Sequence, residues 1–226
     1  MPTSKDILLN VSQLSAGYGQ RQVLFDVSFS VNSGEMVLLI GGNGSGKSTL
    51  LKAIYGLVNK QQAAAIHFNG DNITDTKPYQ LIQKGIVYVP QKNNVFDQLS
   101  VSENLEVAVT HLHDNKQMQQ RITAVFAQLP QLTPLKNRTP FHLSGGEKQL
   151  LALGMALMQQ PKLILLDEPG AGLAPHTWQQ NLETINTLNQ QGITFLIVEH
   201  RVKETIDKMH HVLQMRLGKI INVETT

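Results

Sequence analysis

The run "GGNGSGKST" at residues 41–49 satisfies the pattern G-x-x-x-x-G-K-[ST] from Gly41 to Ser48. Closely spaced glycines let the main chain wrap phosphate groups with its N–H donors turned inward. The lysine supplies a point charge for the β- and γ-phosphates, and the hydroxyl after it can coordinate Mg²⁺. Residues 41–49 are therefore predicted to form a phosphate loop that binds a nucleoside triphosphate.

The flanking residues support this interpretation. The run before the loop, "EMVLLIG" at 35–41, is apolar almost throughout and suits a strand buried on both faces. The run that continues from it, "STLLKAIYGLV" at 48–58, is typical of a helix. A phosphate loop requires this strand–loop–helix order, whereas a glycine-rich surface turn with an exposed lysine does not.

Two consecutive carboxylates, Asp167 and Glu168, end the apolar run "LILLDEP" at 163–169. A carboxylate pair at the end of a buried strand is costly unless a cation or a water network lies nearby. Beside a phosphate loop, the first carboxylate can hold Mg²⁺ and the second can polarise an attacking water. Alone, the run would equally suit a strand that ends at a polar turn, but the phosphate loop favours the functional interpretation.

A second anion site is predicted in "HLSGGEKQLLALG" at 142–154, where a Ser-Gly-Gly turn opens a helix. Such a turn presents free N–H groups at the positive end of the helix dipole. The phosphate loop of the same chain already holds the phosphates from one side. The economical arrangement therefore places this turn against a nucleotide bound to a second chain, although an ordinary capped helix stays an alternative.

Three further polar or aromatic residues are weaker candidates. Gln91 and His200 follow the apolar strands "GIVYVPQ" and "FLIVEH", and ligands gather at the carboxyl ends of strands in α/β sheets. Tyr18 lies in the turn-like segment "AGYGQ" at 16–20. A lone glutamine or histidine at a strand end is usually a satisfied polar residue, and such a tyrosine usually packs. Their functional roles therefore depend on the wider pattern.

The order of elements predicts one domain over residues 1–226 with an α/β P-loop core. The core has a mainly parallel sheet, an antiparallel β-subdomain at the N-terminus and a helical insertion over about 92–160. Ser100 and Glu103 have capping-box spacing, so a helix is predicted to begin near Val101 and residues 101–129 to be mostly helical.

Composition excludes several classes of protein. The chain has 226 residues, no cysteine and a net charge of +2. Its cationic residues are scattered rather than gathered in a basic stripe, so no nucleic-acid partner is expected. The first residues lack the apolar region of a signal peptide. The longest apolar run, residues 150–158, is far shorter than a membrane span. We expect a protein that reaches a membrane only through a partner.

Five motifs occur together in this order: "GGNGSGKST", "VPQ", "LSGGEKQ", "LILLDEP" and "IVEH". In order and spacing they resemble the ATPase subunits of ATP-binding cassette (ABC) transporters over essentially the whole chain. The resemblance implies an ATPase that uses ATP and Mg²⁺ and pairs head to tail with a second ABC ATPase subunit, identical or paralogous. Transmembrane permease subunits are the implied further partners, which would place the chain in the cytoplasm on the inner face of the cell membrane.

The resemblance also implies a role for each matching residue. Glu168 would be the general base, His200 would contact the γ-phosphate, and Gln91 would touch Mg²⁺ and sense the membrane partner. Ser144, Gly145 and Gly146, which we name the signature turn, would act on the partner's ATP. Lys47 joins Glu168, His200 and Gln91 as catalytic, and Ser48, Gln91 and Asp167 are the metal residues. The remaining nucleotide contacts are Tyr18, stacked on adenine, and the phosphate loop: Gly41, Gly42, Asn43, Gly44, Ser45, Gly46, Lys47, Ser48 and Thr49.

Two segments suggest a subgroup. Residues 85–105 and the run "LDEPGAGLAP" at 166–175 resemble the short ATPase subunits of branched-chain amino-acid uptake systems. Ala174 stands where the larger family usually has aspartate, and His200 stands where the subgroup often has glutamine. The run "VEHRVKETID" at 198–207 is closer to the companion subunit of these systems or to the ATPase of lipopolysaccharide export. An exporter therefore stays an alternative. A soluble, non-transport ABC ATPase is less favoured, because the chain carries one cassette and only a short spacer between Gln91 and the signature turn.

Overall fold

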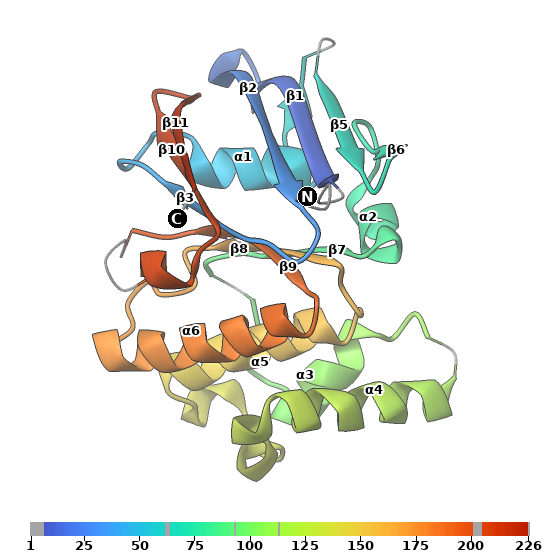
Figure 1. Ribbon diagram of the computed structural model, residues 1–226. Helices are drawn as coiled ribbons and strands as arrows, with labels where there is room; N and C mark the ends of the chain where they lie inside the picture. Colours follow the sequence, from blue (N-terminus) through green and yellow to red (C-terminus); the bar gives the residue numbers. More distant parts are fainter. Residues whose placement is uncertain (1–6, 62–63, 93, 113, 201–204, 226) are drawn as a thin grey trace, which may run out of the picture.

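Two β-sheets and a layer of helices build the fold in the computed structural model, which describes residues 7–61, 64–92, 94–112, 114–200 and 205–225 (Figure 1). The larger sheet has the strand order β11-β10-β3-β9-β8-β7. Strands β10, β3, β9, β8 and β7 are parallel, and β11 pairs antiparallel with β10. The strands are β3 (Met36–Ile40), β7 (Ile86–Val89), β8 (Leu163–Asp167), β9 (Thr194–Val198), β10 (His211–Arg216) and β11 (Lys219–Thr225).

The central strands of this sheet are buried on both faces, which explains their unbroken apolar sequences. Successive side chains alternate between two cores. In β8, Leu163 and Leu165 pack with helix α1 (Lys47–Ile54), whereas Ile164 and Leu166 pack with the helices on the opposite face. Asp167 continues the α1-facing row, so the alternation brings its carboxylate to the side of the sheet where the phosphate loop lies.

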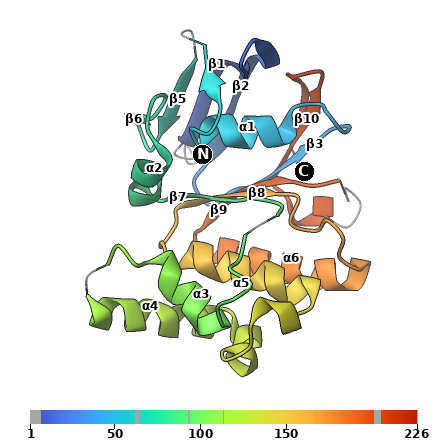
Figure 2. The ribbon, with the colours of Figure 1, turned by 180° about the vertical axis from the view of Figure 1, so that it is seen from behind.

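The smaller sheet is antiparallel and covers α1 from the other side, as Figures 1 and 2 show from opposite directions. Its order is β2-β1-β5-β6, with β4 paired to β1. The strands are β1 (Ile7–Tyr18), β2 (Arg21–Asn32), β4 (Asn59–Lys60), β5 (Ala65–Phe68) and β6 (Asp71–Asn72). The predicted antiparallel start of the chain is therefore present.

The turn predicted at residues 16–20 is wrong in extent, because β1 continues through Tyr18. Ala16, Gly17 and Tyr18 pair with residues of β2, with Tyr18 opposite Arg21. A Cβ on Gly17 would lie 2.1 Å from the carbonyl oxygen of Arg21, so this glycine permits close strand approach rather than a turn. The extension matters because it puts Tyr18 at the tip of a hairpin.

Helices α3 to α6 lie together on the face of the parallel sheet opposite α1 (Figures 1 and 2). The Ser100–Glu103 capping box is present, and the predicted start of α3 at Val101 is confirmed. Residues 101–129 are mostly helical, as predicted, and they form two helices, the second of which is capped by the side chain of Asp114 accepting from Lys116 N and Gln117 N. Besides α1, the described residues form the helices α2 (Pro78–Lys84), α3 (Val101–Ala108), α4 (Asn115–Gln128), α5 (Gly145–Leu157) and α6 (Pro175–Gln190). They also form the 3₁₀ helices Pro130–Leu135, Pro140–His142 and Ile206–Lys208.

Within the part of the chain that the structure describes, no helix has both the length and the apolarity needed to cross a membrane.

Candidate nucleotide site

The phosphate loop connects the end of β3 to the start of α1. Gly46 caps α1 in a left-handed conformation with φ of 107°, and among the described residues the helix has no side-chain cap. The first N–H donors of the helix are therefore open to a ligand. A Cβ on Gly41 would lie 2.3 Å from the carbonyl oxygen of Met215, so the loop packs directly on the end of β10 and only glycine fits there.

The Lys47 ammonium folds back over this loop. Nζ donates to the carbonyl oxygens of Gly41 and Gly42 at 3.0 and 3.2 Å. Burial lowers the pKa of Lys47, while the nearby charges of Glu168 and Asp167 act in the opposite direction. The ammonium lies over the loop that is predicted to hold phosphate and occupies carbonyl acceptors, which phosphate oxygens can replace.

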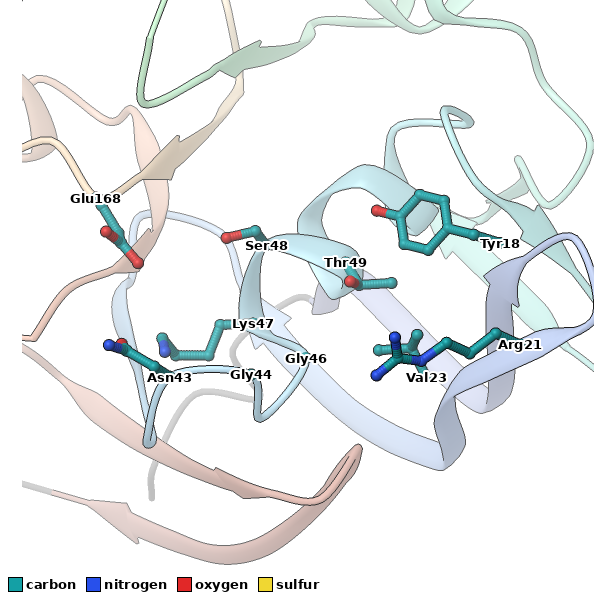
Figure 3. Close-up of a pocket in the computed structure, with 10 residues that line it drawn as sticks. All are labelled: Tyr18, Arg21, Val23, Asn43, Gly44, Gly46, Lys47, Ser48, Thr49 and Glu168. Carbon is teal, nitrogen blue, oxygen red and sulfur yellow. The ribbon is translucent and has the colours of Figure 1, made fainter.

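A cavity of about 530 Å³ opens beside the loop, a volume ordinary for a small-molecule site. Figure 3 shows Tyr18, Arg21 and Val23 toward one end of this cavity and Glu168 with Asn43 toward the other. The lining residues are Tyr18, Arg21, Val23, Asn43, Gly44, Gly46, Lys47, Ser48, Thr49 and Glu168. The fold thus brings the predicted aromatic, most of the phosphate loop and the predicted base to one cavity.

Arg21 and Val23 were missed by the sequence reasoning. Both come from the first residues of β2, and Arg21 pairs with Tyr18 across the hairpin. The signal that could have found them is the pairing itself, since residues that follow a two-residue turn face those that precede it. Placing Tyr18 inside a longer turn concealed that relation.

Asp167 is 4% exposed, and each of its carboxylate oxygens accepts a hydrogen bond from a hydroxyl group. Ser48 Oγ donates to Oδ1 at 2.8 Å, and the Tyr88 hydroxyl donates to Oδ2 at 2.9 Å. Burial raises the pKa of Tyr88, and the charge of Asp167 raises it further. Sequence reasoning did not identify Tyr88, although it lies on the strand that leads to Gln91.

Glu168 contacts two of the three weaker candidates, Gln91 and His200. Gln91 Nε2 donates to Oε2 at 2.7 Å, and His200 Nε2 lies 2.7 Å from Oε1. Its backbone is left-handed, with φ of 51°, yet its N–H still donates to the carbonyl oxygen of Val198 at 2.9 Å. The ends of β7, β8 and β9 therefore deliver Gln91, Glu168 and His200 to one cluster.

A buried carboxylate behind this cluster orients its main chain. Glu199 is 2% exposed, and its two oxygens accept from the N–H groups of Gly170 and His200, both at 2.8 Å. The turn that follows Glu168 is thereby connected to the residue that carries the imidazole. A Cβ on Gly170 would lie 2.6 Å from Glu199 Oε2, so this turn leaves no room for a side chain.

The signature turn contributes no residue to the cavity. Ser144 caps α5, with Oγ accepting from Glu147 N at 3.3 Å and the Glu147 carboxylate accepting from Ser144 N at 2.7 Å. Gly146 is buried against α6, where a Cβ would lie 2.3 Å from Thr177 Cγ2, and its carbonyl accepts from Asn181. The turn is thus rigidly placed, and its glycine N–H groups face no acceptor within the capping box.

The residues predicted to hold Mg²⁺ suit that cation chemically. Ser48 and Asp167 offer oxygen ligands 2.8 Å apart, and Mg²⁺ prefers few protein oxygens together with phosphates and water. The described residues hold no cluster of three or more histidine, cysteine, aspartate or glutamate side chains that would suit another metal. The third predicted ligand, Gln91, has its amide nitrogen on Glu168.

Comparison with known proteins decides the family. Residues 24–171 match the family model described as ABC transporter. The chain belongs to the ABC transporter family. This ABC ATPase is 37% identical to the high-affinity branched-chain amino acid transport ATP-binding protein BraG of Pseudomonas aeruginosa, over 96% of the chain and 93% of BraG. It is 34% identical to the lipopolysaccharide export system ATP-binding protein LptB of Haemophilus influenzae, over 96% of the chain and 90% of LptB.

Solved structures confirm the fold class predicted for this ABC ATPase. The ADP conformation of MJ1267, an ATP-binding cassette of an ABC transporter, superposes with a TM-score of 0.90 at 31% identity. The match covers 97% of the chain and 91% of MJ1267. The protein is an ATP-hydrolysing subunit of the ABC transporter class, as its motifs predicted, and the cavity beside the phosphate loop is its candidate ATP site.

Proposed function

We propose that this ABC ATPase powers the import of branched-chain or other hydrophobic amino acids. The observation that carries the proposal is the similarity to BraG, which extends over 96% of the chain. The runs at 85–105 and 166–175 independently have the character of that subgroup. Amino-acid import is therefore the transport function that similarity and motifs favour together.

Lipopolysaccharide export is the second candidate, and a specific observation favours it as well. LptB of Haemophilus influenzae is nearly as similar as BraG, and LptB of Escherichia coli is 36% identical over 94% of the chain. His200 and the residues after it have the character of that exporter subunit. Residues 201–204 of that run lie outside the described residues.

ATP would occupy the cavity with its base near Tyr18 and its phosphates on the loop. The loop N–H groups and Lys47 would hold the β- and γ-phosphates, with Lys47 exchanging its carbonyl acceptors for phosphate oxygens. Ser48, Asp167 and Gln91 would hold Mg²⁺. When bound, the cation would neutralise charge on the phosphates.

Glu168 is the group proposed to accept a proton from the attacking water. Each carboxylate oxygen has two lone pairs, so the contacts with Gln91 and His200 orient the carboxylate and leave it able to accept from water. The imidazole of His200 would also reach the γ-phosphate once ATP is bound. Charge that develops on the phosphoryl oxygens is stabilised by donors already in place, chiefly Lys47.

The partners follow from the position of the signature turn. It does not line the cavity of its own chain, so we propose that it binds the ATP of a second cassette in a head-to-tail dimer. Transmembrane permease subunits would contact the region around Gln91 and the helical insertion of residues 92–160, which we regard as a subdomain of the single domain 1–226. That contact would hold the chain at the inner, cytoplasmic face of the membrane.

Two serines of this chain offer a matched test of the signature turn. Ser100 and Ser144 cap helices with the same capping-box geometry, at 3.2 and 3.3 Å from the capped N–H. Ser100→Ala and Ser144→Ala should each cost about 1 kcal/mol of stability. Only Ser144→Ala should also lower ATP turnover, by about tenfold, because it alone loses a donor to the partner's phosphate. Equal turnover in both variants would remove the proposed role.

The transport function is tested by deleting the gene and measuring uptake of radiolabelled leucine, isoleucine and valine by whole cells. We expect uptake to fall to the background of cells without the system and to recover with the wild-type gene but not with the Glu168→Gln gene. Undiminished uptake across a panel of amino acids, together with lipopolysaccharide accumulating in the inner membrane, would favour the exporter instead.

A further inference from the structure

The carboxylate of Asp167 is fixed by two elements at once. One hydroxyl donor, Ser48, comes from the first turn of α1, and the other, Tyr88, comes from β7. They bind different oxygens of the carboxylate. In Figure 3 the Ser48 hydroxyl points away from Tyr18 and toward the strand end that carries Glu168. A single donor would hold one oxygen and leave the carboxylate free to turn, whereas two donors on two oxygens fix its plane.

The fold leaves Tyr88 little freedom to move away from Asp167. Tyr88 pairs with Leu165 in the β7–β8 register, two residues before Asp167 on the same face of the sheet. Its ring packs against Tyr55 at the end of α1, with ring centroids 5.6 Å apart. The strand register and the ring contact together keep the hydroxyl within hydrogen-bond distance of Oδ2, at 2.9 Å.

We propose that Tyr88 is a positioning residue for the divalent cation of the bound nucleotide. Its hydroxyl holds Oδ2 of Asp167, so that Oδ1 stays turned to Ser48, where the cation is expected. This inference rests on the proposed function, because it takes Ser48 and Asp167 as the residues that hold Mg²⁺. It goes beyond that function by assigning a role to a residue outside the motifs.

The test compares nucleotide binding with and without metal in Tyr88→Phe, which keeps the ring and removes only the hydroxyl. A fluorescent derivative of the non-hydrolysable analogue AMP-PNP is titrated in EDTA and in excess Mg²⁺. In Tyr88→Phe we expect the nucleotide affinity in EDTA to lie within about twofold of wild type. The increase in affinity on adding Mg²⁺ should be about fivefold smaller than in wild type, which corresponds to the binding free energy of one hydrogen bond. Mn²⁺ immobilisation by the AMP-PNP complex, followed by electron paramagnetic resonance, should weaken by a similar factor.

Tyr55→Phe is the matched control. Tyr55 is buried and its ring packs against the ring of Tyr88, so the variant also loses a hydroxyl from the same pair of rings. It has no bond to Asp167 to lose, and its gain on adding Mg²⁺ should match wild type. Thermal melting of both variants verifies that each is folded.

Three results would overturn the inference and leave the proposed function standing. The first is an increase in nucleotide affinity on adding Mg²⁺ that is as large in Tyr88→Phe as in wild type. The second is an equal reduction of that gain in Tyr55→Phe, which would indicate ring packing. The third is an equal loss of nucleotide affinity in Tyr88→Phe with and without Mg²⁺, which would indicate a displaced phosphate loop. Wild-type protein with no gain on adding Mg²⁺ would instead contradict the proposed metal site itself, and the inference with it.

Discussion

Glu168→Gln is expected to lower ATP turnover by about 10²- to 10⁴-fold while leaving ATP affinity within a few-fold of wild type. General-base catalysis contributes rate factors of this size. Glutamine keeps the length and one acceptor oxygen of glutamate but cannot take a proton from water at neutral pH. The phosphate loop and Lys47 are untouched, so steady-state turnover should collapse while equilibrium binding persists.

The same variant reports on the dimer. ATP that is bound but not hydrolysed should hold two chains together through the signature turn, so light scattering should show a doubled mass with Mg-ATP and not with ADP. Glu183→Gln is the control, since Glu183 pairs with Lys208 on the exposed surface at 2.9 Å and should change neither readout. Retained turnover in Glu168→Gln would remove this residue as the base. Binding without dimerisation would indicate that a different cassette is the native partner.

The core of the fold could be predicted because its signals are local. β3, β8 and β9 are short apolar runs that end in glycines, carboxylates or a histidine, and parallel strands place their carboxyl ends along one edge of a sheet. That argument alone brings the phosphate loop, Glu168 and His200 together. Gln91, at the end of the edge strand β7, joins them by the same rule.

What escaped prediction depends on pairing between distant segments. Arg21 enters the cavity because β1 and β2 stay paired as far as the hairpin tip through several register shifts, and the alternation of apolar residues did not reveal this register. Tyr88 reaches Asp167 because β7 pairs with β8, and no local pattern marks one tyrosine in an apolar strand as a hydrogen-bond donor. The mostly helical character of residues 101–129 was predicted, whereas the start of α4 was not, because it depends on the Asp114 side chain accepting from main-chain N–H groups.

Lys47→Ala is expected to weaken ATP binding by about 10- to 150-fold, the range that one hydrogen bond to a charged phosphate provides. In the structure Nζ already lies over the loop, on the carbonyls of Gly41 and Gly42, so little reorganisation is needed when phosphate arrives. Turnover should fall further than affinity, because the same charge stabilises the phosphoryl oxygens as the bond to the leaving group breaks. Equilibrium titration with a fluorescent ATP analogue measures the first effect and steady-state hydrolysis measures the second.

Lys60→Ala separates this role from the general effect of removing a partly buried ammonium beside α1. Lys60 Nζ donates to the carbonyl oxygen of Ala53 at 3.2 Å near the far end of α1, and burial lowers the pKa of Lys60 as it does that of Lys47. Lys47 and Lys60 thus lie at opposite ends of α1, and of these two only Lys47 lines the cavity. Lys60→Ala should lower thermal stability and leave ATP affinity unchanged. If both variants lost affinity alike, the loss would reflect a disturbed α1, and the direct contact between Lys47 and phosphate would have to be abandoned.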